Sequence, residues 1–563
     1  MDARLSGDPA ERPGRRQVSR VAVGPSTGLI VSYVMLPSVI TIPRMLAQTV
    51  ARYGDQCAIE AGGVRLRYRD LYQRALRAAA ALISRGVEPG DRVAIWAPNG
   101  PEWIIGALGI HFCGASLIPI NTRMRGAEVG YVLETTGANV LLSAGWFLGS
   151  YYPDLLGPYR PATLTTVVVM HDVRHGDIAW HDFLIGGRSI TDDVVEARAL
   201  RVSPEAISDI MFTSGTTGHP KGVMTTHAQN LRAIDGWADA MALAPTDRYL
   251  IVNPFFHAMG YKAGWLAALT RGATILPHRT FDTAAIFDAI EREKITVLPG
   301  PPTVFHSLLN DPRLASTDLS SLRATITGST NVPAALIDRM RSELGFKVVL
   351  TGYGLTESSG FATLTRASDP AEIVANTCGR AMPGVELRIA DERGEAAPAG
   401  VAGEVWIRGY NVMQGYLDNP DATREAIDAQ GWLHTGDVGV IDEMGYLKIT
   451  DRLKDMFIVG GFNCYPAEIE RLAAAHPAVS QIAVVGVPDE RMGEVGRAFV
   501  VLRPNAALDA AQFITWCRAN MANYKVPRYV DFVSSLPTNP SGKVLKRELR
   551  EWPVSVEKAA QHA

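Results

Sequence analysis

Along most of the chain, short apolar runs alternate with longer segments whose apolar residues recur at helical spacing. Residues 68–86 have this helical spacing, residues 91–97 are predicted to form a strand, and residues 102–114 return to helical spacing. Further buried strands are predicted at five short apolar runs: residues 166–170, 274–277, 296–299, 324–327 and 348–351. This alternation of strands and helices predicts an α/β architecture.

Glycine-rich turns and a change of pattern indicate a second, smaller unit near the C-terminal end. Residues 445–451 are predicted to form a strand, which ends at the charged run 451–455. Beyond it we expect a helix that begins at Pro466, a strand at 481–487 and a second helix near 509–521. A unit of about a hundred residues has the size of a small domain. The pattern therefore predicts a large domain over residues 41–451 and a small one over residues 455–563.

Residues 1–40 differ from the rest of the chain. A polar stretch that contains several arginines leads into an apolar run, residues 28–40, which is too short to span a bilayer. No small-residue cleavage site of the kind that ends a signal peptide follows it. We expect a poorly ordered N-terminal extension, with Met35 as an alternative start, and no integral membrane segment.

Composition narrows the class of protein. The chain has 563 residues, too many for one core, of which 47% are hydrophobic and 20% charged, as in soluble globular proteins. A formal net charge of −3 and the lack of a basic stripe give no reason to expect a nucleic-acid partner. The five cysteines are scattered and lack metal-ligand spacing, so we expect reduced thiols in a cytoplasmic protein.

Segment 213–222 has the chemistry of a phosphate-binding loop. It follows an apolar run and is rich in hydroxyls and glycines: Thr213, Ser214, Gly215, Thr216, Thr217, Gly218 and Gly222. The glycines let backbone N–H groups approach an anion, and Lys221 adds a positive charge. The spacing excludes the P-loop of kinases and GTPases, because Pro220 stands where that pattern needs its second glycine. We therefore expect this loop to bind a polyphosphate.

A second polar turn follows the predicted strand at 348–351. Gly352 and Gly354 flank Tyr353, whose ring can lie flat against a purine. Thr356 and Glu357 come next, and a carboxylate is a group that Mg²⁺ binds together with waters and phosphate oxygens. Alone, this turn is equally compatible with a structural role.

Together the two segments resemble motifs of the adenylate-forming superfamily, which contains acyl-CoA synthetases, luciferases and amino-acid adenylation domains. The order Thr-Ser-Gly-Thr-Thr-Gly-x-Pro-Lys-Gly resembles the phosphate loop of that superfamily, and Tyr-Gly-x-Thr-Glu resembles a later motif. Further matches follow in the expected order as far as Lys543, so the resemblance covers nearly all of the chain after residue 40. It implies a large adenylation domain of several subdomains and a small, mobile α+β C-terminal domain, joined by a hinge at residues 452–454.

The resemblance implies a set of residues that bind ATP or AMP: Thr213, Ser214, Gly215, Thr216, Thr217, Gly218, Lys221, Gly328, Ser329, Thr330, Gly352, Tyr353, Gly354, Thr356, Asp437, Arg452 and Lys543. By this resemblance Tyr353 stacks on adenine, while Asp437 and Arg452 bind the ribose hydroxyls. Ser329 and Thr330 depart from the small apolar residues that are commoner in the superfamily at their positions.

Further roles are implied for the chemistry and for the second substrate. Glu357 would hold Mg²⁺ and, with Thr216, His257 and Lys543, would form the catalytic set. Lys454 occupies the hinge position, and the path of CoA would be lined by Gly460, Gly461 and Phe462. The cofactors and substrates implied are ATP, Mg²⁺ and CoA, and a homodimer is compatible with the resemblance.

The segment around His257 separates subgroups of the superfamily. Amino-acid adenylation domains keep an aspartate near this place to bind the substrate's ammonium group, whereas this chain has Phe256 and His257 and no nearby carboxylate. A plain carboxylic acid is therefore expected, with an acyl pocket formed by His257, Ala258, Met259, Val304 and Gly328. The small residues near Gly328 are compatible with a fatty acid or a bulky alicyclic acid, such as a fragment of a steroid ring system.

We therefore predict an ATP-dependent acyl-CoA synthetase, an acid–thiol ligase that forms acyl-AMP, releases pyrophosphate and transfers the acyl group to CoA. An alternative keeps the first step but loads a carrier protein that acts in trans. A luciferase-like oxygenase would share every motif, and CoA-dependent AMP release measured against light output distinguishes the two. A non-catalytic nucleotide-binding protein is disfavoured, because such a protein is expected to have lost Glu357 or Lys543.

Overall fold

The computed structural model describes residues 40–213, 219–328, 332–452, 456–503, 505–537 and 544–553. The first helix, α1 (Ile42–Tyr53), begins at the residue after Thr41. Within the described residues no helix is both long and apolar enough to cross a membrane. All five cysteines are described, and none forms a disulfide.

The largest sheet has eight strands in the order β21-β11-β10-β4-β3-β5-β8-β9. Its bounds are β3 (Arg92–Trp96), β4 (Ser116–Pro119), β5 (Val140–Ser143), β8 (Thr166–Val169), β9 (Ile178–Ala179), β10 (Ile207–Thr213), β11 (Lys221–Thr226) and β21 (Gly415–Tyr416). The strands from β10 to β9 pair in parallel, whereas β10 and β11 form an antiparallel hairpin that continues antiparallel into β21. The predicted strands at 91–97 and 166–170 are confirmed as β3 and β8.

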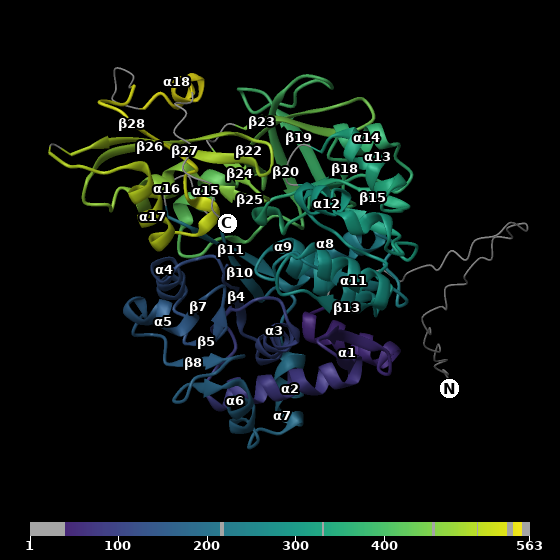
Figure 1. The fold of residues 1–563 in the computed structure, drawn as a ribbon. Helices are drawn as coiled ribbons and strands as arrows, with labels where there is room; N and C mark the ends of the chain where they lie inside the picture. Colours follow the sequence, from purple (N-terminus) through teal and green to yellow (C-terminus); the bar gives the residue numbers. More distant parts are fainter. Residues whose placement is uncertain are drawn as a thin grey trace, which may run out of the picture. The chain divides into compact units, whose positions relative to one another are not determined.

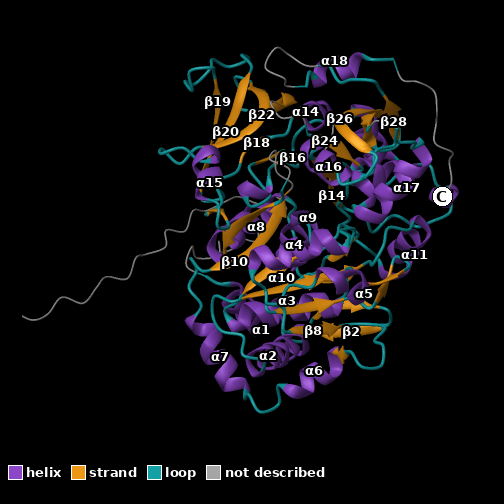
Figure 2. Ribbon diagram, turned by 90° about the vertical axis from the view of Figure 1, so that its left-hand side faces the viewer, coloured by secondary structure: helices purple, strands orange, loops and turns teal. Residues whose placement is uncertain are grey.

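Helices of the N-terminal region cover this sheet. In both views α1, α2 (Tyr68–Ser84) and α3 (Pro101–Cys113) lie together beside its strands (Figures 1 and 2). Every residue of α3 from Trp103 to Cys113 is buried, which explains why the helix is apolar on all sides. The helix has a proline in its first turn and ends at Gly114, whose φ of 77° is a left-handed conformation that favours glycine.

A second sheet carries the strands that lead to the polar turn at residues 352–357. Four strands pair in the order β12 (Arg248–Ile251), β13 (Thr274–Pro277), β1 (Cys57–Ala61) and β2 (Val64–Arg67). Single bridges through Val297 connect β12 to β14 (Ala324–Ile326), which pairs in parallel with β15 (Val348–Leu350). The predicted strand at 296–299 is wrong in its extent, because only Val297 forms bridges, although Leu298 and Gly300 also donate backbone hydrogen bonds to the Ala324 and Ile326 carbonyls, at 3.2 and 3.1 Å.

Mainly antiparallel sheets follow toward the C-terminal end. One contains β19 (Val385–Ala390), β20 (Gly403–Gly409), β22 (Leu433–Ile441) and β23 (Leu447–Arg452). The last region has a core of its own, built on β24 (Phe457–Val459), β25 (Phe462–Cys464), β26 (Val479–Asp489), β27 (Gly493–Leu502) and β28 (Tyr529–Phe532), with helices α16 (Pro466–Ala473), α17 (Ala510–Asn520) and α18 (Lys546–Glu551). Among the described strands of these sheets, only β27 and β28 pair in parallel. The predicted helices at 466 and near 509–521 are confirmed. The predicted strand at 481–487 is longer, because its whole length pairs with β27.

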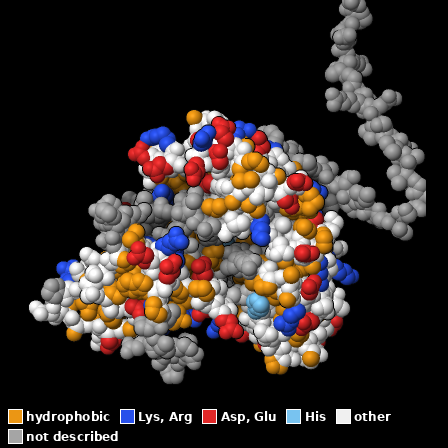
Figure 3. Space-filling view, turned by 90° about the horizontal axis from the view of Figure 1, so that it is seen from above, with side chains coloured by type: hydrophobic (Ala, Val, Ile, Leu, Met, Phe, Trp, Pro, Cys, Tyr) orange, Lys and Arg blue, Asp and Glu red, His pale blue; other side chains and the backbone are white. Residues whose placement is uncertain are grey.

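Acidic, basic and hydrophobic side chains are interspersed on the described part of the face shown in Figure 3, without a continuous basic area there. The mixed α/β fold, with a large N-terminal and a small C-terminal region, is the predicted fold class.

Candidate active site

A cavity of about 2140 Å³ is lined by residues that the sequence assigns to a single site. The predicted site residues that line it are Thr213, His257, Ala258, Met259, Val304, Gly328, Gly352, Tyr353, Gly354, Thr356, Glu357, Asp437, Gly460, Gly461 and Phe462. Other predicted residues lie outside the described residues: Ser214, Gly215, Thr216, Thr217, Gly218, Ser329, Thr330, Lys454 and Lys543. Positions more than two hundred residues apart in sequence therefore surround one space.

The phosphate-loop segment connects the ends of a hairpin. Thr213, the last residue of β10, pairs with Lys221, the first residue of β11. The Thr213 hydroxyl donates to Glu357 Oε1 at 3.4 Å. Lys221 Nζ lies 5.0 Å from the ring centre of Tyr416, near enough for a cation–π contact. The backbone thus brings the flanks of the loop, residues 214–220, to the carboxylate expected to hold a metal.

Tyr416, on β21, belongs to this cluster but was not predicted from the sequence. Its hydroxyl donates to Glu357 Oε1 at 2.9 Å. Burial, together with the charge of Glu357, raises the pKa of Tyr416 far above its usual value, so the phenol keeps its proton. In the sequence, the only feature that marks Tyr416 is its place directly after Gly415. In the structure, the backbone of Gly415 pairs with β11.

Glu357 is a single carboxylate that could hold a metal ion. Among the described residues, no group of three or more His, Cys, Asp or Glu side chains could hold a metal ion. A lone carboxylate fits Mg²⁺, which binds proteins through one or two carboxylates and takes its other oxygens from waters and substrate phosphates. Glu357 Oε1 accepts two hydrogen bonds, from Thr213 and Tyr416, which orient the carboxylate.

The residues expected to bind adenine and ribose are also in contact. Tyr353, on β16 (Gly352–Tyr353), donates its hydroxyl to Asp437 Oδ2 at 2.7 Å. Asp437 lies on β22, where its backbone pairs with that of Arg452 on β23. The three positions therefore lie together, although Tyr353 and Arg452 are 99 positions apart in the sequence.

His257 caps a short helix at the cavity. Its Nδ1 accepts a hydrogen bond from the backbone N–H of Met259 at 3.3 Å, at the start of α9 (Ala258–Gly260). Burial lowers the pKa of His257, so the imidazole is neutral at physiological pH. The chain then continues as a π-helix, η2 (Tyr261–Leu266), a conformation often found near functional sites.

The turn between β24 and β25 brings the C-terminal region into the cavity lining. Gly460 and Gly461 have φ values of 56° and 89°. A Cβ atom on Gly461 would lie 3.5 Å from Cβ of Pro301, so the turn lies close to the large domain. The ring of Phe462 stacks on Tyr524, with centroids 4.6 Å apart, and Asn121 Nδ2 donates to the Tyr524 hydroxyl at 3.1 Å.

Lys525, next to Tyr524, forms a buried ion-pair cluster that the sequence did not predict. Its Nζ lies 2.7 Å from Glu128 of α4 (Gly126–Thr136) and 2.7 Å from Glu468 of α16. The side chains of all three residues are at most 3% exposed. Burial alone would lower the pKa of Lys525, but the charges of Glu128 and Glu468 outweigh it and hold the pKa well above its usual value.

A second buried lysine lies inside the large domain. Lys262, in η2, lies 3.2 Å from Asp209 of β10 and donates to Thr225 of β11 at 3.1 Å. Asp209 also accepts from Thr225 at 3.0 Å and from Ser208 at 2.9 Å. Burial lowers the pKa of Lys262, and Asp209 offsets part of that shift. The network ties the phosphate-loop hairpin to the segment that follows His257.

Comparison with known proteins agrees with this geometry. Residues 46–417 match the family described as AMP-binding enzyme, and residues 468–543 match the AMP-binding enzyme C-terminal domain. The solved amide bond synthetase McbA from Marinactinospora thermotolerans superimposes with a TM-score of 0.81 at 29% identity, covering 91% of this chain and 99% of that one.

Two curated relatives match over almost their entire length. A 3-[(3aS,4S,7aS)-7a-methyl-1,5-dioxo-octahydro-1H-inden-4-yl]propanoyl:CoA ligase of Mycobacterium tuberculosis is 50% identical over 519 residues, which are 92% of this chain and 100% of the relative. A ligase of the same name from Rhodococcus jostii is 48% identical over 518 residues, 91% of this chain and 98% of the relative.

The chain belongs to the AMP-binding enzyme family, within the adenylate-forming superfamily. The prediction of an AMP-forming acid–thiol ligase that makes acyl-CoA is confirmed.

Proposed function

We propose that the acid activated by this acyl-CoA synthetase is a bicyclic propanoic acid with two ring carbonyls, the acid named for the two relatives above. We refer to this acid as the dioxo acid. The observation that carries this proposal is the identity of 50% along the full length of the Mycobacterium tuberculosis ligase.

In the first step, the carboxylate oxygen attacks the α-phosphorus of ATP, and pyrophosphate leaves to give acyl-AMP. Both reactants are anions, so the protein must neutralise charge and align the groups more than it must move protons. We assign alignment of the adenosine to Tyr353 and Asp437 and contact with the phosphates to the 213–221 segment, including Thr216. Mg²⁺, bound at Glu357, would add positive charge at the phosphate oxygens. Lys543 is proposed to contact the reacting groups during this step.

In the second step, the CoA sulfur attacks the acyl carbonyl and AMP leaves. The turn Gly460–Gly461–Phe462 already lines the cavity, and so does His257. We propose that this arrangement is the one used for thioester formation and that the small domain, residues 455–563, rotates about a hinge at Lys454 to bring Lys543 in for the first step. His257 then gates the path between the acyl carbonyl and the thiol. The cytoplasm, which supplies ATP and CoA, is the proposed compartment.

The proposal is tested with purified protein, ATP, Mg²⁺ and CoA. AMP release and acyl-CoA formation are measured with the dioxo acid, with ferulate and with octanoate. We expect kcat/KM for the dioxo acid to exceed that for either other acid by about a hundredfold or more. A higher kcat/KM for ferulate or octanoate would reject the dioxo acid as substrate while leaving the acyl-CoA synthetase chemistry intact.

A further inference from the structure

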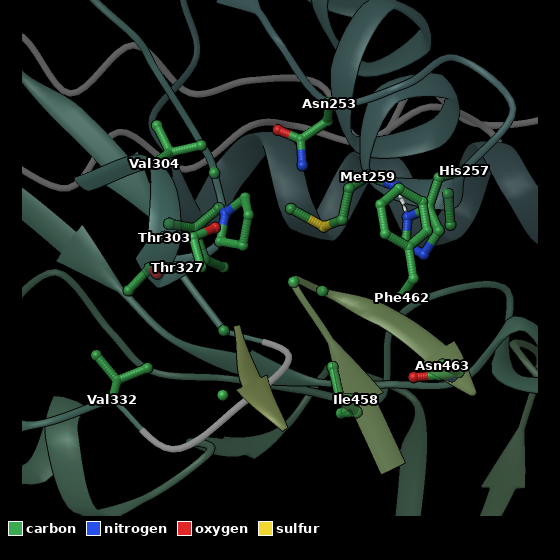
Figure 4. Close-up of a pocket in the computed structure, with 18 of the residues that line it drawn as sticks. Asn253, His257, Met259, Thr303, Val304, Thr327, Val332, Ile458, Phe462 and Asn463 are labelled. Carbon is green, nitrogen blue, oxygen red and sulfur yellow. Dashed lines mark hydrogen bonds between the residues drawn. The ribbon is translucent and has the colours of Figure 1, made fainter. Parts of the chain in front are cut away.

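Asn253 and Thr327 are polar side chains that lie among apolar ones on the predicted acyl side of the cavity. Figure 4 shows Asn253 and Thr327 around the same space as Met259, Val304 and Val332. An apolar wall suffices to bind a hydrocarbon, and a buried polar group that lacks a partner there is destabilising. The two polar side chains therefore need an explanation beyond packing.

Thr327, directly after β14, has a buried hydroxyl with no hydrogen-bond partner in the described part of the chain. Its side chain and backbone are together only 2% exposed, and its backbone N–H donates to the Leu350 carbonyl at 3.0 Å. Thr325, two residues earlier and fully buried, gives the contrast, because its hydroxyl donates to the Leu298 carbonyl at 2.7 Å. Thr325 does not line the cavity. The unpaired hydroxyl is thus the one at the cavity.

Asn253 shows the same contrast between its backbone and its side chain. Its backbone carbonyl accepts from Asn99 Nδ2 at 2.9 Å, and Asn99 also accepts from the Phe255 N–H at 2.8 Å, so the loop before His257 is held in place. The side-chain oxygen of Asn253, however, is buried without a partner among the residues that the structure describes. Turning the amide over by 180° puts its N–H₂ group in the place of this oxygen, because the two ends of an amide have nearly the same shape, and the side chain then donates instead of accepting.

We propose that Thr327 and Asn253 form a polar subsite that binds a ring carbonyl oxygen of the acyl group. The Thr327 hydroxyl and the Asn253 amide N–H₂ donate hydrogen bonds to that carbonyl, which can only accept them. This inference rests on the proposed function in one respect, that an oxygenated ring acid occupies the cavity. The subsite makes the enzyme selective for oxidised rings over hydrocarbon rings of equal size, since a buried donor without an acceptor disfavours the hydrocarbon.

The test uses two matched pairs of acids and measures kcat/KM for each. One pair is the dioxo acid and its ring hydrocarbon, 3-(7a-methyl-octahydro-1H-inden-4-yl)propanoate; the other is 3-(oxocyclohexyl)propanoate and 3-cyclohexylpropanoate. In the wild type we expect the keto acid of a pair to be preferred by about tenfold or more. Thr327→Val, which keeps the shape and removes the hydroxyl, should lower kcat/KM for the keto acid about tenfold and leave that for the hydrocarbon unchanged or raised. Asn253→Leu should act in the same direction.

Thr325→Val is the matched control, because it removes a similarly buried hydroxyl two residues earlier, on β14, that already has a partner. It should leave the keto-to-hydrocarbon ratio at the wild-type value, even if it destabilises the protein. If the wild type shows no keto preference with either pair, or if Thr327→Val and Thr325→Val change the ratio alike, the subsite is refuted. If the wild type rejects both bicyclic acids, the proposed substrate fails, and the cyclohexyl pair still decides the subsite.

Discussion

Among the described residues, two lysines are buried almost completely, in surroundings that differ in charge and in location. Lys262 has one carboxylate partner, Asp209, within a network of hydroxyls and amides inside the large domain. Lys525 lies between two carboxylates, Glu128 of the large domain and Glu468 of the C-terminal region. Burial lowers the pKa of Lys262, whereas two charges raise that of Lys525.

The difference indicates which part of the site is fixed and which part can separate. The Lys262 network joins β10, β11 and η2, which share one hydrophobic core, so breaking it disrupts the frame that carries the phosphate loop and His257. The Lys525 cluster joins two regions with separate cores. It can open without disrupting either core, as a domain rotation between the two steps requires.

The largest effect is expected from a residue proposed to act only when the Lys525 cluster is open. Lys543→Ala should lower the rate of acyl-AMP formation about a thousandfold, because a positive charge near the reacting phosphate is lost. It should largely spare thioester formation from synthetic acyl-AMP. Rapid-quench measurement of each half-reaction tests this, and equal losses in both would show that the two steps share one arrangement.

Removing the partner of Asp209 should destabilise the fixed region strongly. Lys262→Met leaves a buried carboxylate without its counter-charge, and we expect the free energy of unfolding to fall by about 3–5 kcal/mol. Urea denaturation followed by tryptophan fluorescence measures the change. The double variant Asp209→Asn, Lys262→Met, which removes both charges, should recover part of the loss. A single variant as stable as wild type would contradict the assigned role of the pair.

Acid should weaken the same fixed region through His111 of α3. Its Nε2 lies 3.1 Å from the hydroxyl of Tyr261, the first residue of η2, and its ring lies 5.3 Å from that of His227. Burial lowers the pKa of His111 from its usual value of 6.5 to about 3. Between these two pKa values, the side chain of His111 is protonated in the unfolded chain but neutral in the folded protein. The free energy of unfolding therefore falls as the pH drops below about 6.5.

For His111 alone, the free energy of unfolding falls by about 2 kcal/mol between pH 7 and pH 5. His111→Gln should therefore lose about 2 kcal/mol less than wild type over that interval in urea denaturation. His227, whose pKa is lowered by burial and by the charge of His111, is present in both proteins, and the loss of His111 removes part of that shift, which acts in the same direction as the expected effect. Parallel pH profiles for the two proteins would show that His111 does not titrate as described.

Local patterns predicted much of the fold, and the reason is visible in particular elements. Residues 68–86 have helical periodicity and form α2, Tyr68–Ser84, since that periodicity depends only on neighbours along the chain. At residues 296–299 the same reasoning overestimated the strand, because an apolar run does not show how many of its residues form bridges with neighbouring strands, and here only Val297 does.

The site was predictable where the chemistry lies in one contiguous motif. Glu357 and Tyr353 line the cavity as expected, since each lies in a run of residues with a recognisable order. Tyr416 and Lys525 were missed, because their partners come from other elements, and Glu128 lies 397 residues from Lys525 in the sequence. Such contacts are created by the tertiary fold and have no signal of their own in the sequence.

The smallest expected effect tests the central claim most directly, namely that the Lys525 cluster holds the arrangement used for thioester formation. Glu128→Gln keeps the side-chain oxygen that accepts from the Arg125 N–H, but it removes the negative charge that faces Lys525. Both half-reactions are measured by rapid quench in this variant and in wild type. We predict that CoA-dependent discharge of acyl-AMP slows about tenfold while acyl-AMP formation keeps its wild-type rate. Unchanged discharge, or an equal slowing of both steps, would contradict the account.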